Sequence, residues 1–172
     1  MDVVLSTPSP ADAAEFIAAA RASKSLHHPW INPPDTAERF AAYLARAARD
    51  DQASYLIRHS QCGALVGYVN VGNIVRGALQ SGYVGYAGFA SHAGRGLMTA
   101  GLRSVIDACF TELGLHRLEA NIQPDNLRSL GLVRRLGFTR EGFSPNYLLI
   151  DGDWRDHERW ALLAEDWSGR PV

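Results

Sequence analysis

The sequence predicts a single α/β (α+β) domain over residues 1–172, and two observations lead to this fold class. Short apolar strands alternate with amphipathic helices in the order β-α-α-β-β-β-α-β-α-β-β. A length of 172 residues suits one sizeable core, and a content of 47% hydrophobic and 20% charged residues is typical of a folded chain. We therefore expect one folded unit without internal repeats or linkers.

In the first third of the chain, the pattern predicts one strand followed by two helices. Residues 3–6 form an apolar strand, and Ser9 with Asp12 provides a helix N-cap and the acid of a capping box. A proline-containing segment, residues 26–34, separates this helix from a second one, for which Asp35 is the expected N-cap.

The middle of the chain predicts three consecutive strands. β-branched and aromatic residues are frequent in residues 54–59, 65–74 and 83–89, and turn residues around Gly63 separate the first two. Further along, residues 117–122 alternate between apolar and polar side chains, which indicates a half-buried strand.

Two amphipathic helices are predicted in the second half of the chain. Apolar residues recur at three- and four-residue steps after Gly96 as far as Gly114, which ends the first helix. Asn126 caps the second helix and Gly137 ends it. Two strands around a two-residue hairpin turn complete the order: residues 138–150, Asp151-Gly152 and residues 154–163.

Between the strand at 83–89 and the helix that follows it lies a glycine-rich loop that suits a phosphate. The first N–H groups of a helix have no partner within it, and the helix dipole is positive at that end. Gly94 and Gly96 let an anion approach the backbone, and Arg95 adds a guanidinium donor. The alternative is a plain glycine turn, because the stretch matches neither the P-loop nor the dinucleotide pattern. The expected phosphate-binding residues are Gly94, Arg95, Gly96, Leu97, Met98 and Thr99.

Composition and charge exclude several classes of function. The formal net charge of -1 gives no bulk attraction to nucleic acid or to an anionic membrane, so neither is an expected partner. Cys62 and Cys109 are too few for a disulfide framework or a zinc site, and no metal is expected. The N-terminus lacks a signal-peptide pattern and no run approaches the ~18 apolar residues of a membrane span, so we expect a cytoplasmic protein.

Several stretches of the sequence together resemble a known enzyme family. They are His28-Pro29-Trp30, residues 115–129 with a Pro-x-Asn-x-x-Ser spacing, residues 134–143 with a Leu-Gly-Phe-x-x-Glu-Gly run, and residues 151–157. With the glycine-rich loop, they resemble the GCN5-related N-acetyltransferase (GNAT) superfamily, in its RimJ/RimL-like branch that acetylates the N-termini of ribosomal proteins. The resemblance covers most of the chain, from about residue 30 to residue 161.

The resemblance implies the GNAT fold, a twisted mixed central sheet with helices on both faces. In that fold the strands at 83–89 and 117–122 diverge and leave a wedge for the pantetheine arm of acetyl-CoA, the expected cofactor. The glycine-rich loop would hold the pyrophosphate, and backbone groups near Phe89 and Ala90 would bind the pantetheine amides. Outside the loop, the expected cofactor residues are Phe89, Ala90, Asn121, Asn126, Ser129 and Arg135. For Arg135 the alternative is a solvated charge on the helix surface.

Acetyl transfer from a thioester to an amine requires a neutral amine, a polarised carbonyl and a proton for the leaving thiolate. Ser129 is the predicted proton donor, and a first-turn serine bonded to local backbone is the alternative. Glu119 is a candidate for handling the amine proton, although a glutamate there is more often the partner of an arginine such as Arg117. Further candidates for this proton are His27, His28 and Glu141.

The chain departs from the family pattern at two positions. Leu148 stands where some ribosomal-protein enzymes carry a carboxylate proposed as the base, and a leucine cannot take a proton. Ala93 stands where members usually carry Gln or Arg near the phosphates, and His92 is a candidate substitute or an exposed loop residue without a role.

The resemblance implies an acetyl-CoA-dependent N-acetyltransferase that works by direct attack in a ternary complex. The expected acceptor is a primary amine, namely the α-amine of a protein or peptide N-terminus. The expected acceptor wall consists of Trp30, His28, Tyr86 and Tyr147, with core packing as the alternative for the aromatic residues. Two alternative functions are acetylation of a small amine, such as an antibiotic or polyamine, and non-catalytic sensing of acyl-CoA. A homodimer formed through strand edges is left open.

Overall fold

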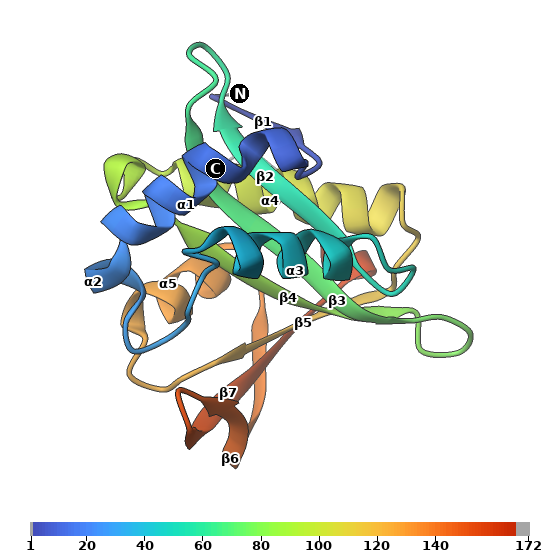
Figure 1. Ribbon diagram of the computed structural model, residues 1–172. Coiled ribbons are helices and arrows are strands. Elements are labelled where there is room, and N and C mark those ends of the chain that lie inside the picture. The colour runs from blue at the N-terminus through green and yellow to red at the C-terminus, as the bar shows by residue number, and fades with distance from the viewer. Residues whose placement is uncertain (1, 168–172) are drawn as a thin grey trace.

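A mixed sheet organises the molecule, and the computed structural model describes it within residues 2–167 (Figure 1). Its strands are β1 (Val3–Ser6), β2 (Ala53–His59), β3 (Leu65–Val75), β4 (Ser81–Gly88), β5 (Arg117–Ile122), β6 (Thr139–Ile150) and β7 (Asp153–Leu163). The seven strands lie in the order β1-β2-β3-β4-β5-β7-β6. β4 and β5 are parallel, and the other neighbouring pairs in the described residues are antiparallel.

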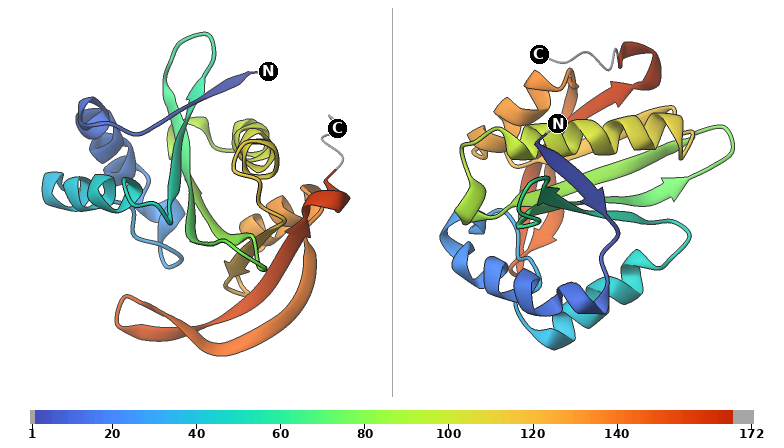
Figure 2. Two further views of the ribbon diagram at one scale, coloured as in Figure 1. Left: turned by 90° about the vertical axis from the view of Figure 1, so that its right-hand side faces the viewer. Right: turned by 90° about the horizontal axis from the view of Figure 1, so that it is seen from above.

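Helices cover both faces of this sheet (Figure 2). α1 (Ala13–Ala22) and α3 (Ala37–Ala47) pack on one face, and α4 (Leu97–Thr111) and α5 (Leu127–Arg135) pack on the other. The expected fold class is therefore confirmed. The observed order adds a short α-helix, α2 (Lys24–His27), at the start of the proline-containing segment, and three 3-10 turns elsewhere in the described residues. Across residues 2–167, no helix is both long enough and apolar enough to cross a membrane.

The two sides of the sheet have cores of different composition. On the side of α1 and α3 the core is aromatic, and the ring of Phe16 lies 5.0 Å from that of Phe40 and 5.4 Å from that of Phe89. On the side of α4 and α5 it is mainly aliphatic and includes Leu102 and Val133. Burying these apolar side chains stabilises the fold that positions β4 between the two cores.

The start of α3 differs from the prediction by one residue. Its N-cap is Thr36, whose side-chain oxygen accepts a hydrogen bond from the N–H of Arg39 at 3.3 Å. The carboxylate of Asp35, the expected cap, forms ion pairs with Lys24 and Arg39 instead. A charged group gains more from two cations than from one backbone N–H, so the capping role passes to the next residue.

The predicted turn between the last two strands is confirmed. Asp151 and Gly152 have φ values of 53° and 84°, and two successive positive φ values are those of a type I′ hairpin turn. Gly137, at φ 88°, follows α5 in the position expected of a helix-ending glycine.

A bulge interrupts the β6–β7 ladder. Ser144 pairs with His157, and the ladder resumes where Leu148 pairs with Arg155. Residues 145–147 of β6 therefore lie opposite the single residue Asp156 of β7. Asn146 lies within the extra stretch at φ 48°, and its N–H donates to a carboxylate of β7 at 2.8 Å. Such a bulge bends the strand and changes the direction of the side chains that follow it.

Candidate active site

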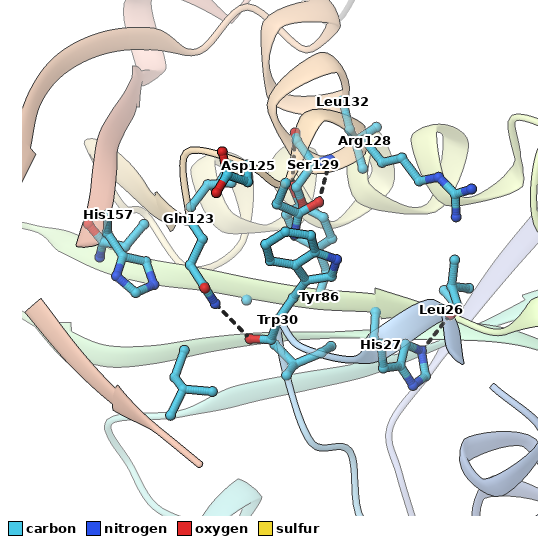
Figure 3. A pocket seen from close by; sticks show the side chains of 18 of the residues that line it. Leu26, His27, Trp30, Tyr86, Gln123, Asp125, Arg128, Ser129, Leu132 and His157 are labelled. Carbon is cyan, nitrogen blue, oxygen red and sulfur yellow. Dashed lines mark hydrogen bonds between the residues drawn. The ribbon is translucent and has the colours of Figure 1, made fainter. Parts of the chain in front are cut away.

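The parallel strands β4 and β5 separate after a short paired stretch, and a cavity opens between them. Their pairing covers residues 81–83 of β4 and 117–119 of β5. The diverging ends, with α2, α5 and the β6–β7 hairpin, enclose a cavity of about 740 Å³ (Figure 3). Its wall includes Leu26, His27, Trp30, Val84, Tyr86, Gly88, Met98, Asn121, Gln123, Asp125, Asn126, Arg128, Ser129, Leu132, Leu148, Ile150 and His157.

One edge of β4 is free along this cavity. The N–H of Phe89 donates to β3 at 2.8 Å, so the backbone groups of Phe89 and of every second residue before it point toward β3. The alternation turns the backbone groups of Val84, Tyr86 and Gly88 toward the opposite edge. The carbonyl of Gly88 is engaged there by Nε2 of His27 at 2.8 Å. The C=O of Val84 and the N–H and C=O groups of Tyr86 therefore face the cavity, beyond the point where β5 stops pairing.

The backbone groups expected from Phe89 and Ala90 are engaged within the protein. The N–H of Phe89 donates to the Val66 carbonyl, and the N–H of Ala90 donates to the Ser23 hydroxyl at 2.9 Å. The side chain of Phe89 is 1% exposed and belongs to the aromatic core. The free backbone groups of β4 consequently lie earlier in the strand than the sequence analysis expects.

The glycine-rich loop has the backbone that only glycine adopts readily. Gly94 and Gly96 both have φ of 76°, and Gly96 is the left-handed N-cap of α4. The first hydrogen bond of the helix runs from the N–H of Ala100 to the carbonyl of Gly96, so the N–H groups of residues 97–99 precede it without a helical acceptor. Arg95 is exposed, the side chain of Leu97 is buried, and Met98 lies on the cavity wall.

Ser129 and Tyr86 meet across the cavity between α5 and β4 (Figure 3). The Ser129 hydroxyl donates to the Tyr86 hydroxyl oxygen at 3.0 Å, and the Tyr86 hydroxyl lies 3.4 Å from the backbone carbonyl of Ser129. The side-chain oxygen of Asn126 accepts from the N–H of Ser129 at 3.2 Å, as expected of a cap. Burial raises the pKa of Tyr86 to about 12, against a smaller lowering by Ser129, so the phenol is neutral at pH 7.

Two other expected cofactor residues have different positions. Asn121 lies on the cavity wall, and its buried side-chain oxygen has no hydrogen-bond partner in the described residues. A buried acceptor of this kind is normally paired, which indicates that a ligand N–H belongs there. Arg135 is exposed at the end of α5, away from the cavity wall.

Three expected side chains lie outside the cavity wall. The carboxylate of Glu119 accepts from Nε of Arg117 at 2.7 Å, the arginine partnership that the sequence left as an alternative. His28 is exposed and lines a smaller hollow beside α2. Tyr147 lies in the β6 bulge, where its ring centre is 6.0 Å from that of His157.

The segment that follows α2 forms one side of the cavity. Trp30 lies on the wall, as expected, and its carbonyl accepts from Nε2 of Gln123 at 3.3 Å (Figure 3). The side-chain amide of Asn32 contacts the carboxylate of Asp151 at the tip of the β6–β7 hairpin. These contacts join the segment to the end of β5 and to the hairpin, so three distant parts of the chain enclose the same space.

His157 is a wall residue that was not predicted from the sequence. Its side chain is buried, its Nδ1 lies 2.9 Å from the Arg155 carbonyl, and burial lowers its pKa. His157 belongs to a stretch that carried the family resemblance, but its burial distinguishes it from the neighbouring charged residues only in the folded chain. His27, also buried, is committed to the Gly88 carbonyl.

Comparison with known proteins adds a family assignment to this geometry. A family model described as an acetyltransferase (GNAT) domain matches residues 2–139. The chain is 37% identical over 129 residues to YjcK of Bacillus subtilis, described as a probable N-acetyltransferase, covering 75% of this chain and 71% of that protein. It is 42% identical over 104 residues to the ribosomal protein uS5-alanine N-acetyltransferase of Escherichia coli, covering 60% of this chain and about half, 54%, of that enzyme.

Solved structures share the fold over nearly the whole chain. RimJ of Mycobacterium smegmatis in complex with CoA-disulfide has a TM-score of 0.88 at 31% identity, covering 96% of this chain and 84% of that one. Spermidine N-acetyltransferase of Vibrio cholerae in complex with CoA and spermine has a TM-score of 0.82 at 18% identity, covering 96% of this chain and 98% of that one. The second likeness concerns the fold alone.

Proposed function

Because the chain belongs to the GNAT acetyltransferase family, we propose that it transfers acetyl from acetyl-CoA to the α-amine of a protein or peptide N-terminus. GNAT acetyltransferases use acetyl-CoA, and the chain is an N-acetyltransferase of this kind. The class of acceptor is the part that is proposed. The observation that supports this class of acceptor is the chemistry of one part of the cavity wall. This part lies on the side of the β6–β7 hairpin, includes Trp30, Leu148 and Ile150, and is here termed the acceptor side.

The acceptor side is apolar and nearly free of charge. Trp30, Leu148 and Ile150 form much of it. Among the described wall residues, the Asp, Glu, Lys and Arg side chains are those of Asp125 and Arg128, and both are exposed. Such a wall offers little attraction to a polycation such as a polyamine. It suits an amine beside a small uncharged side chain.

The ionisation of the amine favours an N-terminus over a lysine. An N-terminal amine has a pKa of about 8, so roughly a tenth of it is neutral at pH 7, whereas a lysine has a pKa of about 10.4 and is almost entirely charged. The N-terminal amine therefore needs only a weak base. This requirement agrees with the presence of Leu148 where related enzymes carry a carboxylate.

The residues of the cavity fit acetyl-CoA at three places. The free backbone groups of Val84 and Tyr86 suit the pantetheine amides, and the unpaired side-chain oxygen of Asn121 suits an N–H donor. The N–H groups at the start of α4 suit the phosphates. Acetyl-CoA, when bound, supplies the thioester from which the acetyl group is transferred.

We assign protonation of the leaving sulfur to Ser129, held by Tyr86. The hydrogen bond between the two hydroxyls holds Ser129 at the wall of the cavity, and rotation of the Ser129 hydroxyl turns its one hydrogen from Tyr86 to the sulfur. A neutral hydroxyl near the sulfur can donate a proton to a developing thiolate. Glu119 has no part in this assignment, because its carboxylate is paired with Arg117.

Matched peptides test the acceptor class. A peptide with a free, small N-terminal residue should be acetylated faster than the same peptide blocked at its N-terminus and carrying a lysine, measured as release of free thiol. Spermidine and an aminoglycoside complete the panel of amines. Equal rates on the blocked lysine peptide, or activity on the small amines alone, contradict the proposal. Binding of acetyl-CoA without turnover on any amine indicates a sensor.

A further inference from the structure

We propose that Nε2 of His157 accepts the proton that the acceptor amine releases in this reaction. The inference rests on the proposed function, because it names the base for the same transfer. His157 lies on β7, is 2% exposed, and forms part of the cavity wall, as Gln123 and Trp30 also do (Figure 3).

The hydrogen bonding of the ring determines which nitrogen is basic. Nδ1 lies 2.9 Å from the carbonyl oxygen of Arg155. Because a carbonyl can only accept, Nδ1 carries the hydrogen and Nε2 keeps its lone pair. Within the described residues, Nδ1 is the ring nitrogen with a bonded partner, so Nε2 is available to a ligand in the cavity.

The surroundings keep the ring neutral at pH 7. Burial lowers the pKa of His157 by more than the Arg155 carbonyl and the nearby charge of Asp156 raise it. On the β6 side the ring faces Tyr147, whose ring centre lies 6.0 Å away. The other titratable side chains on the cavity wall are His27, Tyr83, Tyr86, Asp125 and Arg128. None of them is bonded to His157 in the described part of the chain.

The other candidates for this role are engaged or displaced. The carboxylate of Glu119 is bonded to an arginine of its own strand and lies outside the wall. Nε2 of His27 is 2.8 Å from a carbonyl of β4 and must carry a hydrogen to make that bond. Asp125 is on the wall but exposed. His157 is thus the buried wall residue with a free lone pair.

The proton balance of the transfer is then complete. As the amine nitrogen bonds to the acetyl carbon and the carbon–sulfur bond breaks, His157 takes one proton from the nitrogen at Nε2. Ser129 gives one proton to the sulfur, which keeps the bonding electron pair. Water then carries the proton from His157 back to Ser129, so the enzyme ends the cycle in the state in which it began.

The first test needs no reaction and no variant. Nitrogen-15 NMR of the parent protein should show His157 in the Nδ1–H tautomer, neutral at pH 7, with a pKa below the ordinary value of 6.5. Exposed His116, which pairs with Glu165, serves as the surface reference. An Nε2–H tautomer, or a charged ring at neutral pH, overturns the proposal.

The second test compares kcat as a function of pH in His157→Gln and His116→Gln. His157→Gln should lower kcat at pH 7 by about 10²-fold, the lower end of the range for general acid–base groups, and should lose the acidic limb of the profile. His116→Gln should keep both, and the calorimetric affinity for acetyl-CoA should be unchanged in either variant. A His157→Gln profile with the rate and acidic limb of the parent overturns the proposal.

The two tests separate this inference from the proposed function. The kinetic comparison uses whichever amine the parent acetylates, so failure on peptides alone refutes the acceptor class and still tests His157. If the parent acetylates no amine, the proposed function fails, and the NMR tautomer decides whether the free lone pair exists.

Discussion

The two halves of the cavity present different parts of the protein. The cofactor half offers mainly backbone, through Val84 and Tyr86 of β4 and the N–H groups that follow Gly96. The acceptor half offers side chains, such as Trp30 and His157. Backbone groups are fixed by strand register and by the positions of glycines, and most side-chain changes leave them in place. The acceptor half can change with a single substitution, so it is there that specificity within the family has room to vary.

The largest effect on activity is expected for Ser129, which lies where the cofactor half and the acceptor half of the cavity meet. Ser129→Ala should lower kcat by roughly 10²–10⁴-fold and leave the affinity for acetyl-CoA unchanged, because the hydroxyl acts on the leaving sulfur and not on cofactor binding. Steady-state kinetics and calorimetry measure the two quantities.

Ser104→Ala is the matched control for that variant, since its hydroxyl donates to the Ala100 carbonyl within α4 at 3.3 Å. It should turn over like the parent. If Ser129→Ala does the same, the proton comes from another group, and Ser129 is part of the helix start only.

A comparison of two glycine-to-alanine variants tests whether cofactor binding depends on the backbone of the glycine-rich loop. Gly96 and Gly77 have φ of 76° and 72°, and an added Cβ would meet nothing within 4 Å at either position. Alanine at either site should therefore destabilise the fold similarly, by about 1–2 kcal/mol. Gly96→Ala should in addition weaken acetyl-CoA binding by roughly 10-fold or more, because it disturbs a charge-assisted phosphate contact.

Thermal unfolding measures the shared strain of the two alanine variants, and calorimetry measures their cofactor affinity. Equal affinities in Gly96→Ala and Gly77→Ala would remove the phosphate role of the loop. If Gly96→Ala is destabilised but binds acetyl-CoA with the affinity of the parent, the glycines of the loop serve only as a turn between strand and helix.

The smallest effect is expected at the acceptor wall. Trp30→Ala should raise KM for an N-terminal peptide by about 10-fold, as loss of apolar contact area predicts, with little change in acetyl-CoA binding. Trp154→Ala is the control, because Trp154 is 60% exposed and lies outside the cavity wall. A matching rise in both variants would show that Trp30 acts through stability and not through the acceptor.

Local signals predicted the framework well. The cap at Asn126, the glycine at 137 and the Asp151-Gly152 turn each depend on one or two backbone groups, which a short sequence stretch specifies. The cap of α3 was wrong because Lys24, far from Asp35 in sequence, competes for its carboxylate. Such competition is a property of the folded chain and has no local signature.

The site was harder to predict from the sequence than the framework, because it too depends on contacts between distant parts of the chain. The divergence of β4 and β5 followed from family resemblance, whereas the engagement of the Ala90 N–H by Ser23 depends on α1 meeting the end of β4. The bond between Tyr86 and Ser129 joins two elements that are distant in the chain. His157 needed both its burial and its bonded Nδ1 before its role could be inferred.

The bulge in β6 has a consequence for how copies of this protein meet in concentrated solution. β6 is the outermost strand of the sheet, and an uninterrupted outer strand is a template on which another chain can add and start an aggregate. The bulge breaks that template: Pro145 has no N–H to offer, and the N–H of Asn146 is already bonded to β7. Two copies therefore cannot join β6 to β6 along its full length, and the exposed Phe143 and Leu149 lie on either side of the interruption. The bulge that precedes the wall residue Leu148 thus also opposes self-assembly at this edge.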